Sequence, residues 1–277
     1  MKKIISVVLA LVLCLCLFAA CAPAETTPTI TNGINDATGT TGSGEQALNT
    51  LEAGKLIMST NAEFPPYEMT DDDGNYIGID VEIATAIAEK LGLELEIMDV
   101  DFDAALLAVQ EGKSDIVMAG VTVNEDRKLV MDFTESYATG VQVVIVKEDS
   151  DVTMDNLGEK MIGAQRGTTG YIYASDTPEN GGYGEDHVIA YDNGATAVQA
   201  LLAGKVDCVI IDSAPAAEFV KANAGLTTLE GEWVTENYAI GCDKGNTELV
   251  NAINDVLAEL INDGTVQTIV DKYITAE

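Results

Sequence analysis

Arg127 lies in the segment AGVTVNEDR at 119–127, close to Gly120 and Thr122. It is one of two arginines in a chain of 277 residues that has 46 Asp and Glu residues and a formal net charge of −32. Because such a chain cannot attract anions by its overall field, an anionic ligand needs a local site. A guanidinium fork with hydroxyl and backbone N–H donors suits a carboxylate. The segment therefore predicts a carboxylate site, and a surface ion pair with the acids just before Arg127, of about 0–1 kcal/mol, is the alternative.

A second glycine–threonine cluster, GTTG at 167–170, directly follows the other arginine, Arg166. It can offer the same hydroxyl and backbone donors, or it can be an ordinary turn that caps a helix. The two interpretations are compatible, since the N-terminus of a helix also attracts anions. Arg166 alternates outward in this register, so we do not assign it to a site.

Asp212 ends an apolar run at 207–212. A carboxylate at the end of a strand that faces a cleft needs a cationic partner. From the residues alone, however, a helix cap is the favoured interpretation, because Ala214-Pro215 is a normal helix start.

An internal similarity relates the segment that ends at Gly120 to the segment that ends at Asp212. The stretch 106–120 recurs at 197–212 with a constant spacing of 92 residues, and each copy reads as a helix, a Gly-Lys turn and an apolar strand. The register makes Gly120 and Asp212 equivalent strand ends. Ligands of open α/β sheets bind outside the carboxyl ends of strands, so two facing lobes would bring both residues to one cleft. A common α/β turn is the alternative explanation.

Alternating strands and helices predict an α/β fold with mainly parallel sheets. The predicted elements are strands at 55–60, 93–100, 115–120, 140–147 and 238–244, helices at 79–92 and 102–112, and two helices within 248–274 separated at 262–264. We expect two lobes, each a mainly parallel sheet flanked by helices, joined by a two-strand hinge. The expected boundaries are 51–142 for the first part of lobe 1, 143–238 for lobe 2 and 239–277 for the return to lobe 1.

Residues 1–20 predict a signal peptide, with Lys2 and Lys3 before an apolar run that is too short to span a bilayer comfortably. The run ends before Cys21 and resembles a bacterial lipoprotein signal, in which that cysteine is lipidated, for example with palmitate. An ordinary secretion signal is the alternative. Residues 21–50 have almost no large apolar side chains and predict a flexible tether. The strong negative charge excludes nucleic acid as a partner.

The remaining cysteines, Cys208 and Cys242, could form a disulfide or be free buried thiols. No spacing typical of metal ligands occurs, and His187 lies in a polar loop, so we expect no metal. We expect no cofactor, and the P-loop motif of nucleotide-driven transporters is absent from the sequence.

The folded part resembles the extracellular solute-binding proteins of bacterial amino-acid ABC importers, which have a periplasmic-binding-protein-like fold. The resemblance covers about 54–274. It rests on the order and spacing of the motifs NAEFPPYEM, GIDVEIATAIAEKLG, DFDAALLAVQEGKSDIVMAG, VTVNEDRKLVMDFTESY, QRGTTG and VDCVIIDSAP.

The resemblance implies a site for a free L-amino acid. Its α-carboxylate would meet Arg127, Gly120, Thr122 and Thr169, and its ammonium would meet Asp212. The other implied site residues are the Ala119 carbonyl near the ammonium, the walls Phe64, Phe102 and Gln165, and Asn61, where the family often carries an acid. A neutral amide at position 61 argues weakly for a neutral polar or small amino acid, although Glu63 could balance a cationic one.

The resemblance also implies a function. The expected protein is a monomer that captures the amino acid by hinge closure, is lipid-anchored on the outer face of the cell membrane, and delivers to a permease with a cytoplasmic ATPase. A cyclohexadienyl-dehydratase-like enzyme is one alternative, with Glu63 as the only plausible base. A ligand-sensing domain is another.

Overall fold

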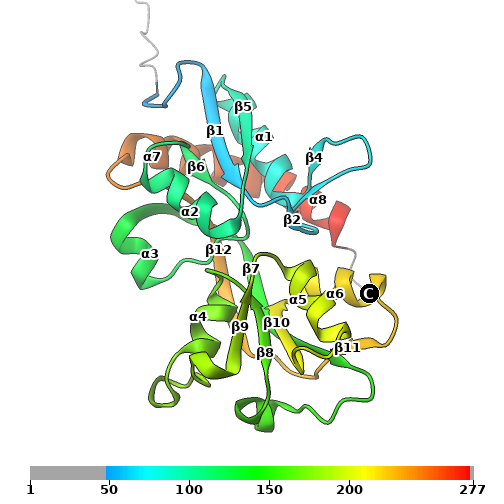
Figure 1. The fold of residues 1–277 in the computed structure, drawn as a ribbon. Coiled ribbons are helices and arrows are strands. Elements are labelled where there is room, and N and C mark those ends of the chain that lie inside the picture. The colour runs from blue at the N-terminus through cyan, green and yellow to red at the C-terminus, as the bar shows by residue number, and fades with distance from the viewer. Residues whose placement is uncertain (1–47, 275–277) are drawn as a thin grey trace, which may run out of the picture. The chain divides into compact units, whose positions relative to one another are not determined.

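The computed structural model describes residues 48–274 (Figure 1). The predicted signal peptide, Cys21 and the predicted tether up to residue 47 lie outside the described residues. By its internal contacts the chain divides at residue 45, and 46–277 is a unit of its own. Within the part that the structure describes, no helix combines the length and the apolar character needed to cross a membrane.

A nine-stranded sheet organises this unit. Its order is β5-β1-β6-β12-β7-β10-β8-β9, with β11 paired to β7. The strands are β1 (Lys55–Thr60), β5 (Glu94–Asp99), β6 (Ile116–Val117), β7 (Met131–Lys147), β8 (Ile162–Gln165), β9 (Val188–Tyr191), β10 (Cys208–Asp212), β11 (Leu226–Thr228) and β12 (Val234–Asp243). A small second sheet contains β2 (Glu63–Phe64), β3 (Glu68–Thr70) and β4 (Tyr76–Ile77).

The two ends of the large sheet are parallel and its centre is antiparallel. At one end β1 pairs in parallel with β5 and β6, and at the other β8 pairs in parallel with β9 and β10. Between them β7 and β12 form a long antiparallel pair. We call the part around β1, β5 and β6 the first lobe and the part around β8, β9 and β10 the second lobe. The predicted lobe boundaries fall within β7 and β12, which continue into both lobes, so their positions stay a prediction.

Helices pack against each lobe (Figure 1). The helices are α1 (Ile79–Lys90), α2 (Phe102–Gln110), α3 (Glu125–Val130), α4 (Thr169–Ser175), α5 (Gly194–Leu202), α6 (Ser213–Ala222), α7 (Thr247–Asn262) and α8 (Thr265–Tyr273), with short 3₁₀ helices at Met154–Glu159, Pro178–Asn180 and Glu185–His187. In the first lobe α2 contacts β1 and β6, and α1 contacts β5 and α8. In the second lobe α4 and α5 contact both β8 and β10.

The predicted fold class is confirmed, and most predicted elements occur within a few residues of their expected ends. The strand predicted at 140–147 is the second half of β7, which already begins at Met131. The two C-terminal helices are confirmed. They separate at Asp263-Gly264, where Gly264 has a φ of 82° that only glycine adopts readily.

The internal repeat is also present in the structure. In the first lobe the N–H of Lys113 donates to the Ala108 carbonyl, and in the second the N–H of Lys205 donates to the Ala200 carbonyl. An aspartate follows each turn and accepts a hydrogen bond from a neighbouring segment. The Asp115 carboxylate accepts the Ile57 N–H, just as the Asp207 carboxylate accepts the Met161 N–H, both at 2.8 Å. The sequence similarity therefore reflects two copies of one helix–turn–strand unit.

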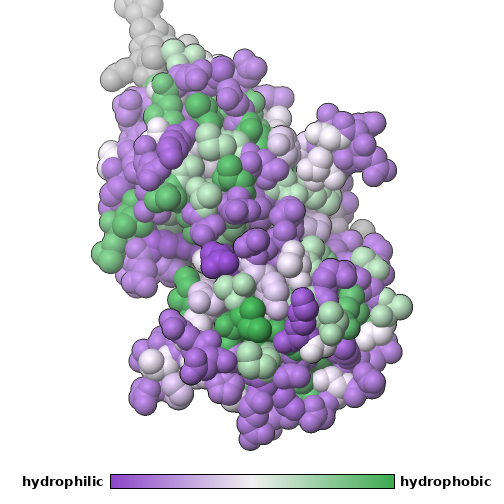
Figure 2. Space-filling model, viewed as in Figure 1, coloured by the Kyte–Doolittle hydropathy of each residue, from purple (hydrophilic) through white to green (hydrophobic). Residues whose placement is uncertain are grey.

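Apolar side chains fill the space between the sheet and the helices, and the face in Figure 2 is mainly hydrophilic. Cys208 and Cys242 lie in these cores as free, buried thiols, so of the two open interpretations the free form is correct. Burial raises the pKa of each thiol to about 12.

Candidate functional site

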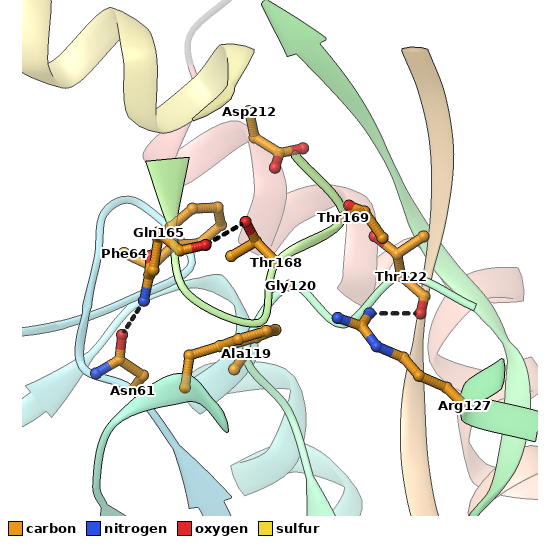
Figure 3. Close-up of a pocket in the computed structure, with 11 residues that line it drawn as sticks. Asn61, Phe64, Ala119, Gly120, Thr122, Arg127, Gln165, Thr168, Thr169 and Asp212 are labelled. Carbon is orange, nitrogen blue, oxygen red and sulfur yellow. Dashed lines mark hydrogen bonds between the residues drawn. The ribbon is translucent and has the colours of Figure 1, made fainter. Parts of the chain in front are cut away.

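A small cavity, partly open to solvent, lies at the carboxyl ends of strands from both lobes (Figure 3). All ten residues proposed from the sequence line it. They are Asn61, Phe64, Phe102, Ala119, Gly120, Thr122, Arg127, Gln165, Thr169 and Asp212, and Thr168 joins them. The structure thus brings the whole predicted set together, and whether it binds ligand stays a prediction.

Arg127 reaches the cavity from the short helix α3, which Asn124 caps by accepting the Arg127 backbone N–H. Its side chain is buried, so it does not form the surface ion pair that was the alternative. Glu125 pairs with Lys128 instead. The guanidinium donates to the Thr122 carbonyl at 2.8 Å and to the Gly167 carbonyl of the second lobe at 3.0 Å.

Burial lowers the pKa of Arg127 to about 10, although nearby Glu236 and two tyrosines oppose this shift. The guanidinium therefore stays charged at neutral pH. Its carbon lies 5.5 Å from the centre of the Phe102 ring, a cation–π distance. Only two of its five N–H donors are used by the carbonyls, so an anion can still be bound.

Thr168 and Thr169 have different roles. Thr168 is the N-cap of α4, since its hydroxyl oxygen accepts the Tyr171 N–H, so the helix-cap interpretation of GTTG is correct, and its role in ligand binding stays a prediction. Thr169 is the first helical residue, and its N–H has no intrahelical partner. Gly167, just before them, has a φ of 76° and approaches Asp103 so closely that a Cβ would lie 3.2 Å from that side chain. The sequence singled out Thr169 and missed Thr168, although the same motif contains both.

Asp212 enters the cavity from the end of β10. It is the N-cap residue of α6 by backbone position, but its side chain makes no capping hydrogen bond and is directed elsewhere. Its carboxylate accepts hydrogen bonds from the Gln142 amide, at 2.6 Å, and from the Tyr238 hydroxyl. Burial raises the pKa of Asp212 to about 7, the Tyr238 hydrogen bond lowers it, and the charge of Glu236 raises it. An ionised Asp212 is thus costly without a cation beside it.

Gly120 lies three residues beyond the end of β6, at the position that the repeat aligns with Asp212 at the end of β10. It has a φ of 54°, and a Cβ there would lie 2.9 Å from the Phe64 ring, so no other residue fits easily. Its N–H donates to the carboxylate of the fully buried Asp80 at 2.9 Å. Burial raises the pKa of Asp80 to about 6, and the Gly120 and Tyr137 hydrogen bonds oppose this. Asp80 therefore holds the Gly120 backbone beside the cavity.

Two amides join the lobes at the other end of the cavity. The Gln165 side-chain NH₂ donates to the Asn61 side-chain oxygen at 2.9 Å, and the Asn61 NH₂ donates to the Val100 carbonyl at 3.1 Å (Figure 3). Glu63 does not line the cavity. It is exposed and accepts a hydrogen bond from Asn193 at 2.8 Å, so it faces the opposite lobe rather than a ligand.

The aromatic walls are fixed by packing. Phe64 stacks on Tyr67 with ring centres 5.9 Å apart, and Tyr67 meets the edge of Tyr238 at 5.3 Å. Tyr67 therefore packs between Phe64 and Tyr238 and is not among the lining residues. Phe102 is the first residue of α2 and is also buried.

Two buried residues behind the cavity were missed by the sequence reasoning. Glu236 on β12 accepts hydrogen bonds from the Thr122 and Thr169 hydroxyls, and the Gln142 amide on β7 bridges Glu236 and Asp212. The position of Gln142 inside the apolar run GVQVVIVK could have indicated a buried polar contact. For Glu236 the sequence gives no comparable signal. Among residues 48–274 no cluster of His, Cys, Asp and Glu could hold a metal ion.

The fold and the cavity define a two-lobed α/β protein with a site between its lobes. A profile of the bacterial extracellular solute-binding proteins, family 3, matches residues 56–276, and the chain belongs to this family. The predicted resemblance is thereby confirmed. The chain is an extracytoplasmic solute-binding protein by family.

Named relatives are similar over nearly the whole folded part. The L-cystine-binding protein TcyJ of Escherichia coli (strain K12) is 30% identical over 238 residues, which are 84% of this chain and 88% of that protein. A probable histidine-binding protein of Neisseria gonorrhoeae is 33% identical over 240 residues, with 84% and 88% covered. Among solved structures, an ancestral arginine-binding protein bound to glutamine has a TM-score of 0.74 and 36% identity, covering 81% of this chain and all of that one. These relatives are binding proteins rather than enzymes.

Proposed function

We propose that the protein captures a free L-amino acid for an ABC importer. The observation that carries this proposal is the charge of the cavity lining. Among its residues, Arg127 is the single cation and Asp212 the single anion, and they come from different lobes. A zwitterion balances both charges, whereas a simple anion or cation balances one.

The two charges orient the ligand. Its α-carboxylate meets the unused N–H groups of Arg127 and the backbone N–H groups of Thr122 and Thr169, for which the described residues provide no partner. Its ammonium meets Asp212, with the Ala119 carbonyl as a further acceptor. The ammonium compensates the cost of burying an ionised Asp212.

The ligand side chain extends toward Asn61 and Gln165, between Phe64 and Phe102. Because both polar groups are neutral amides and Glu63 lies outside the lining, we propose a neutral polar or small amino acid. The similar ancestral protein was solved with glutamine bound, which is consistent with this choice. The names of other relatives specify cystine, histidine and arginine, so these belong in any ligand screen.

Capture proceeds by closure of the lobes around β7 and β12. Hydrogen bonds between Asn61 and Gln165, and between Arg127 and Gly167, join the lobes directly. A ligand that contacts both Arg127 and Asp212 adds differential stability to this arrangement. We further propose that the protein is a monomer, anchored to the outer face of the cell membrane through a lipid on Cys21. It delivers its ligand to a permease with a cytoplasmic ATPase.

We propose binding without turnover. A dehydratase needs an acid or base over the ligand, and the plausible base from the sequence, Glu63, is exposed and hydrogen-bonded to Asn193. Incubation with prephenate tests this directly. Any loss of prephenate that depends on the presence of this protein contradicts the proposal.

Thermal melting of residues 46–277 against the twenty common L-amino acids and L-cystine tests the binding proposal. A ligand at about 100 times its dissociation constant adds about 2.7 kcal/mol of stability. The protein is unfolded, washed and refolded first, because a retained ligand would mask the shift. The matched control is Arg166→Ala, which removes the exposed arginine, against Arg127→Ala in the cavity. If no amino acid shifts the melt, or if Arg127→Ala responds like Arg166→Ala, the proposal is wrong.

Lipidation is tested separately on the full chain, because it does not depend on the ligand. Cells that express the wild type or Cys21→Ser are labelled with a radioactive fatty acid. We expect label on the wild type only. Equal labelling of both, or of neither, contradicts the anchor.

A further inference from the structure

The carboxylate of Glu236 lies behind the cavity on β12 and is 5% exposed. One of its oxygens, Oε2, accepts three hydrogen bonds. They come from the Thr169 hydroxyl at 2.7 Å, the Gln142 amide at 3.0 Å and the Thr122 hydroxyl at 3.1 Å. Its other oxygen, Oε1, is fully buried and has no hydrogen-bond partner among the described residues. Glu236 is thus a buried, half-satisfied carboxylate, which is costly to maintain.

Both hydroxyls that Glu236 engages line the ligand cavity, one from each lobe. A threonine hydroxyl has a single hydrogen to donate. Because Thr122 and Thr169 both donate to Glu236, neither hydroxyl is free to donate to a ligand carboxylate in this arrangement. These are the hydroxyls that the sequence motifs assigned to the ligand.

Glu236 also interacts with the cation of the site. Its charge is the largest factor that raises the pKa of Arg127 against the lowering caused by burial. An α-carboxylate bound at Arg127 is therefore a second negative charge near Glu236. Like charges in a site of low polarity repel each other strongly.

We propose that Glu236 lowers the affinity of the site by competing, as an internal carboxylate, with the α-carboxylate of the ligand for Thr122, Thr169 and Arg127. This inference rests on the proposed amino-acid site. Such a residue sets the affinity rather than the choice of side chain, because it lies at the carboxylate end and away from Asn61 and Gln165. A binding protein that must release its ligand to a transporter gains from a limited affinity.

Glu236→Gln isolates the effect because it keeps the shape of the side chain. The repulsion between Glu236 and the ligand carboxylate disappears. The amide NH₂ of the new side chain donates to one threonine oxygen, which leaves that hydroxyl hydrogen for the ligand. Arg127 also loses its internal counter-charge and depends more on the ligand. All three changes favour binding, so we expect a dissociation constant at least tenfold lower.

Titration calorimetry on the full chain tests this, with the same twenty amino acids and L-cystine as probes for the wild type. The tightest of them and its α-carboxamide are then titrated into the wild type, Glu236→Gln, Glu236→Asp and Glu230→Gln. Glu230 is exposed, so Glu230→Gln removes one charge without touching the site. Far-UV circular dichroism checks that each variant is folded.

We expect Glu236→Gln to tighten binding of the free amino acid at least tenfold and binding of its carboxamide less than twofold. Glu230→Gln should stay within twofold of the wild type. Glu236→Asp keeps the charge but withdraws it from the hydroxyls, so a smaller gain of about threefold is expected. If Glu236→Gln does not fold, the affinity of Glu236→Asp tests the proposal instead.

Two outcomes are kept apart. If the wild type binds no amino acid, the proposed function fails. If the wild type binds and the folded Glu236 variants bind equally or more weakly, or tighten the carboxamide just as much, Glu236 does not compete with the ligand carboxylate and this inference is overturned.

Discussion

Asp212→Asn should make the protein more stable and a poorer binder at the same time. Burial raises the pKa of Asp212 from its ordinary value of 3.8 to about 7. The proton therefore binds the folded protein more tightly than the unfolded chain. This cost to stability is absent below about pH 4, grows as the pH rises, and is complete above the folded pKa of about 7. At about 1.36 kcal/mol per pKa unit, the shift sets an upper limit of roughly 4 kcal/mol.

The neighbours of Asp212 can accept an asparagine. Its side-chain oxygen can still accept from the Gln142 NH₂, which keeps its bond to Glu236, and its own NH₂ can donate to the Tyr238 hydroxyl oxygen. We therefore expect refolded Asp212→Asn to gain about 1–4 kcal/mol over the wild type at pH 8 and close to zero at pH 4. Its affinity for the amino acid should fall at least 100-fold, because a buried ammonium without its partner costs about 3–5 kcal/mol.

Urea unfolding of residues 46–277 at pH 4, 6 and 8 measures the first effect, and titration calorimetry at pH 8 measures the second. Asp192→Asn is the matched control, since Asp192 is exposed and pairs only with Arg166 at 3.4 Å. Its effect should stay within about 0.5 kcal/mol. The assignment of Asp212 as a buried ligand-binding carboxylate is refuted by either of two results. One is a variant that is less stable than the wild type at pH 8, and the other is a gain in stability as large at pH 4 as at pH 8.

Four further outcomes follow. Wild-type affinity should fall by up to about 100-fold from pH 8 to pH 5, as Asp212 takes up a proton, and Asp212→Asn should abolish this dependence in calorimetry. Arg127→Lys should weaken binding by about 10- to 100-fold, because a lysine lacks the planar fork. Gly140→Ala should cost at least 1–3 kcal/mol in urea unfolding, because its Cβ would overlap the Tyr238 hydroxyl and Asp212. A thiol reagent at pH 8 should label residues 46–277 only after unfolding, because Cys208 and Cys242 are buried with pKa values of about 12.

The shared cleft of Gly120 and Asp212 could be predicted from the repeat, whereas the other cavity residues were implied by the resemblance to the family. The repeat places Gly120 and Asp212 at equivalent strand ends, and ligands of α/β sheets bind at such ends. The observed pair of aspartates, Asp115 and Asp207, explains why the repeat is visible in the sequence. Each follows its Gly-Lys turn and accepts a backbone N–H from the neighbouring segment, that of Ile57 in β1 and that of Met161 before β8.

The residues behind the cavity could not be predicted in the same way. Glu236 lies between the exposed Thr235 and Asn237, in the regular part of the pairing of β12 with β7. Alternation along a strand assigns a side chain to one face of a sheet, but it does not identify the distant hydroxyls and amide that contact an acid there. The role of Asp212 was also open from local sequence, because a cap and a ligand group have the same neighbours along the chain. The distinction needs the partner side chains, Gln142 and Tyr238, which lie on strands distant in sequence.

The hydrogen-bond donors around the proposed position of the ligand α-carboxylate bear on both the proposed function and the proposed role of Glu236. The Gly120 N–H donates to Asp80, and the Thr122 and Thr169 hydroxyls donate to Glu236. Arg127 gives two of its donors to carbonyls. A ligand carboxylate therefore gains only the remaining donors, or it must take donors from groups that are already satisfied. Since exchanging one hydrogen bond for another contributes little net free energy, the contribution of the ligand carboxylate to the affinity depends mainly on the charges of Arg127 and Glu236. The sign of the effect of Glu236→Gln is thus the most direct measure of how this site limits its own affinity.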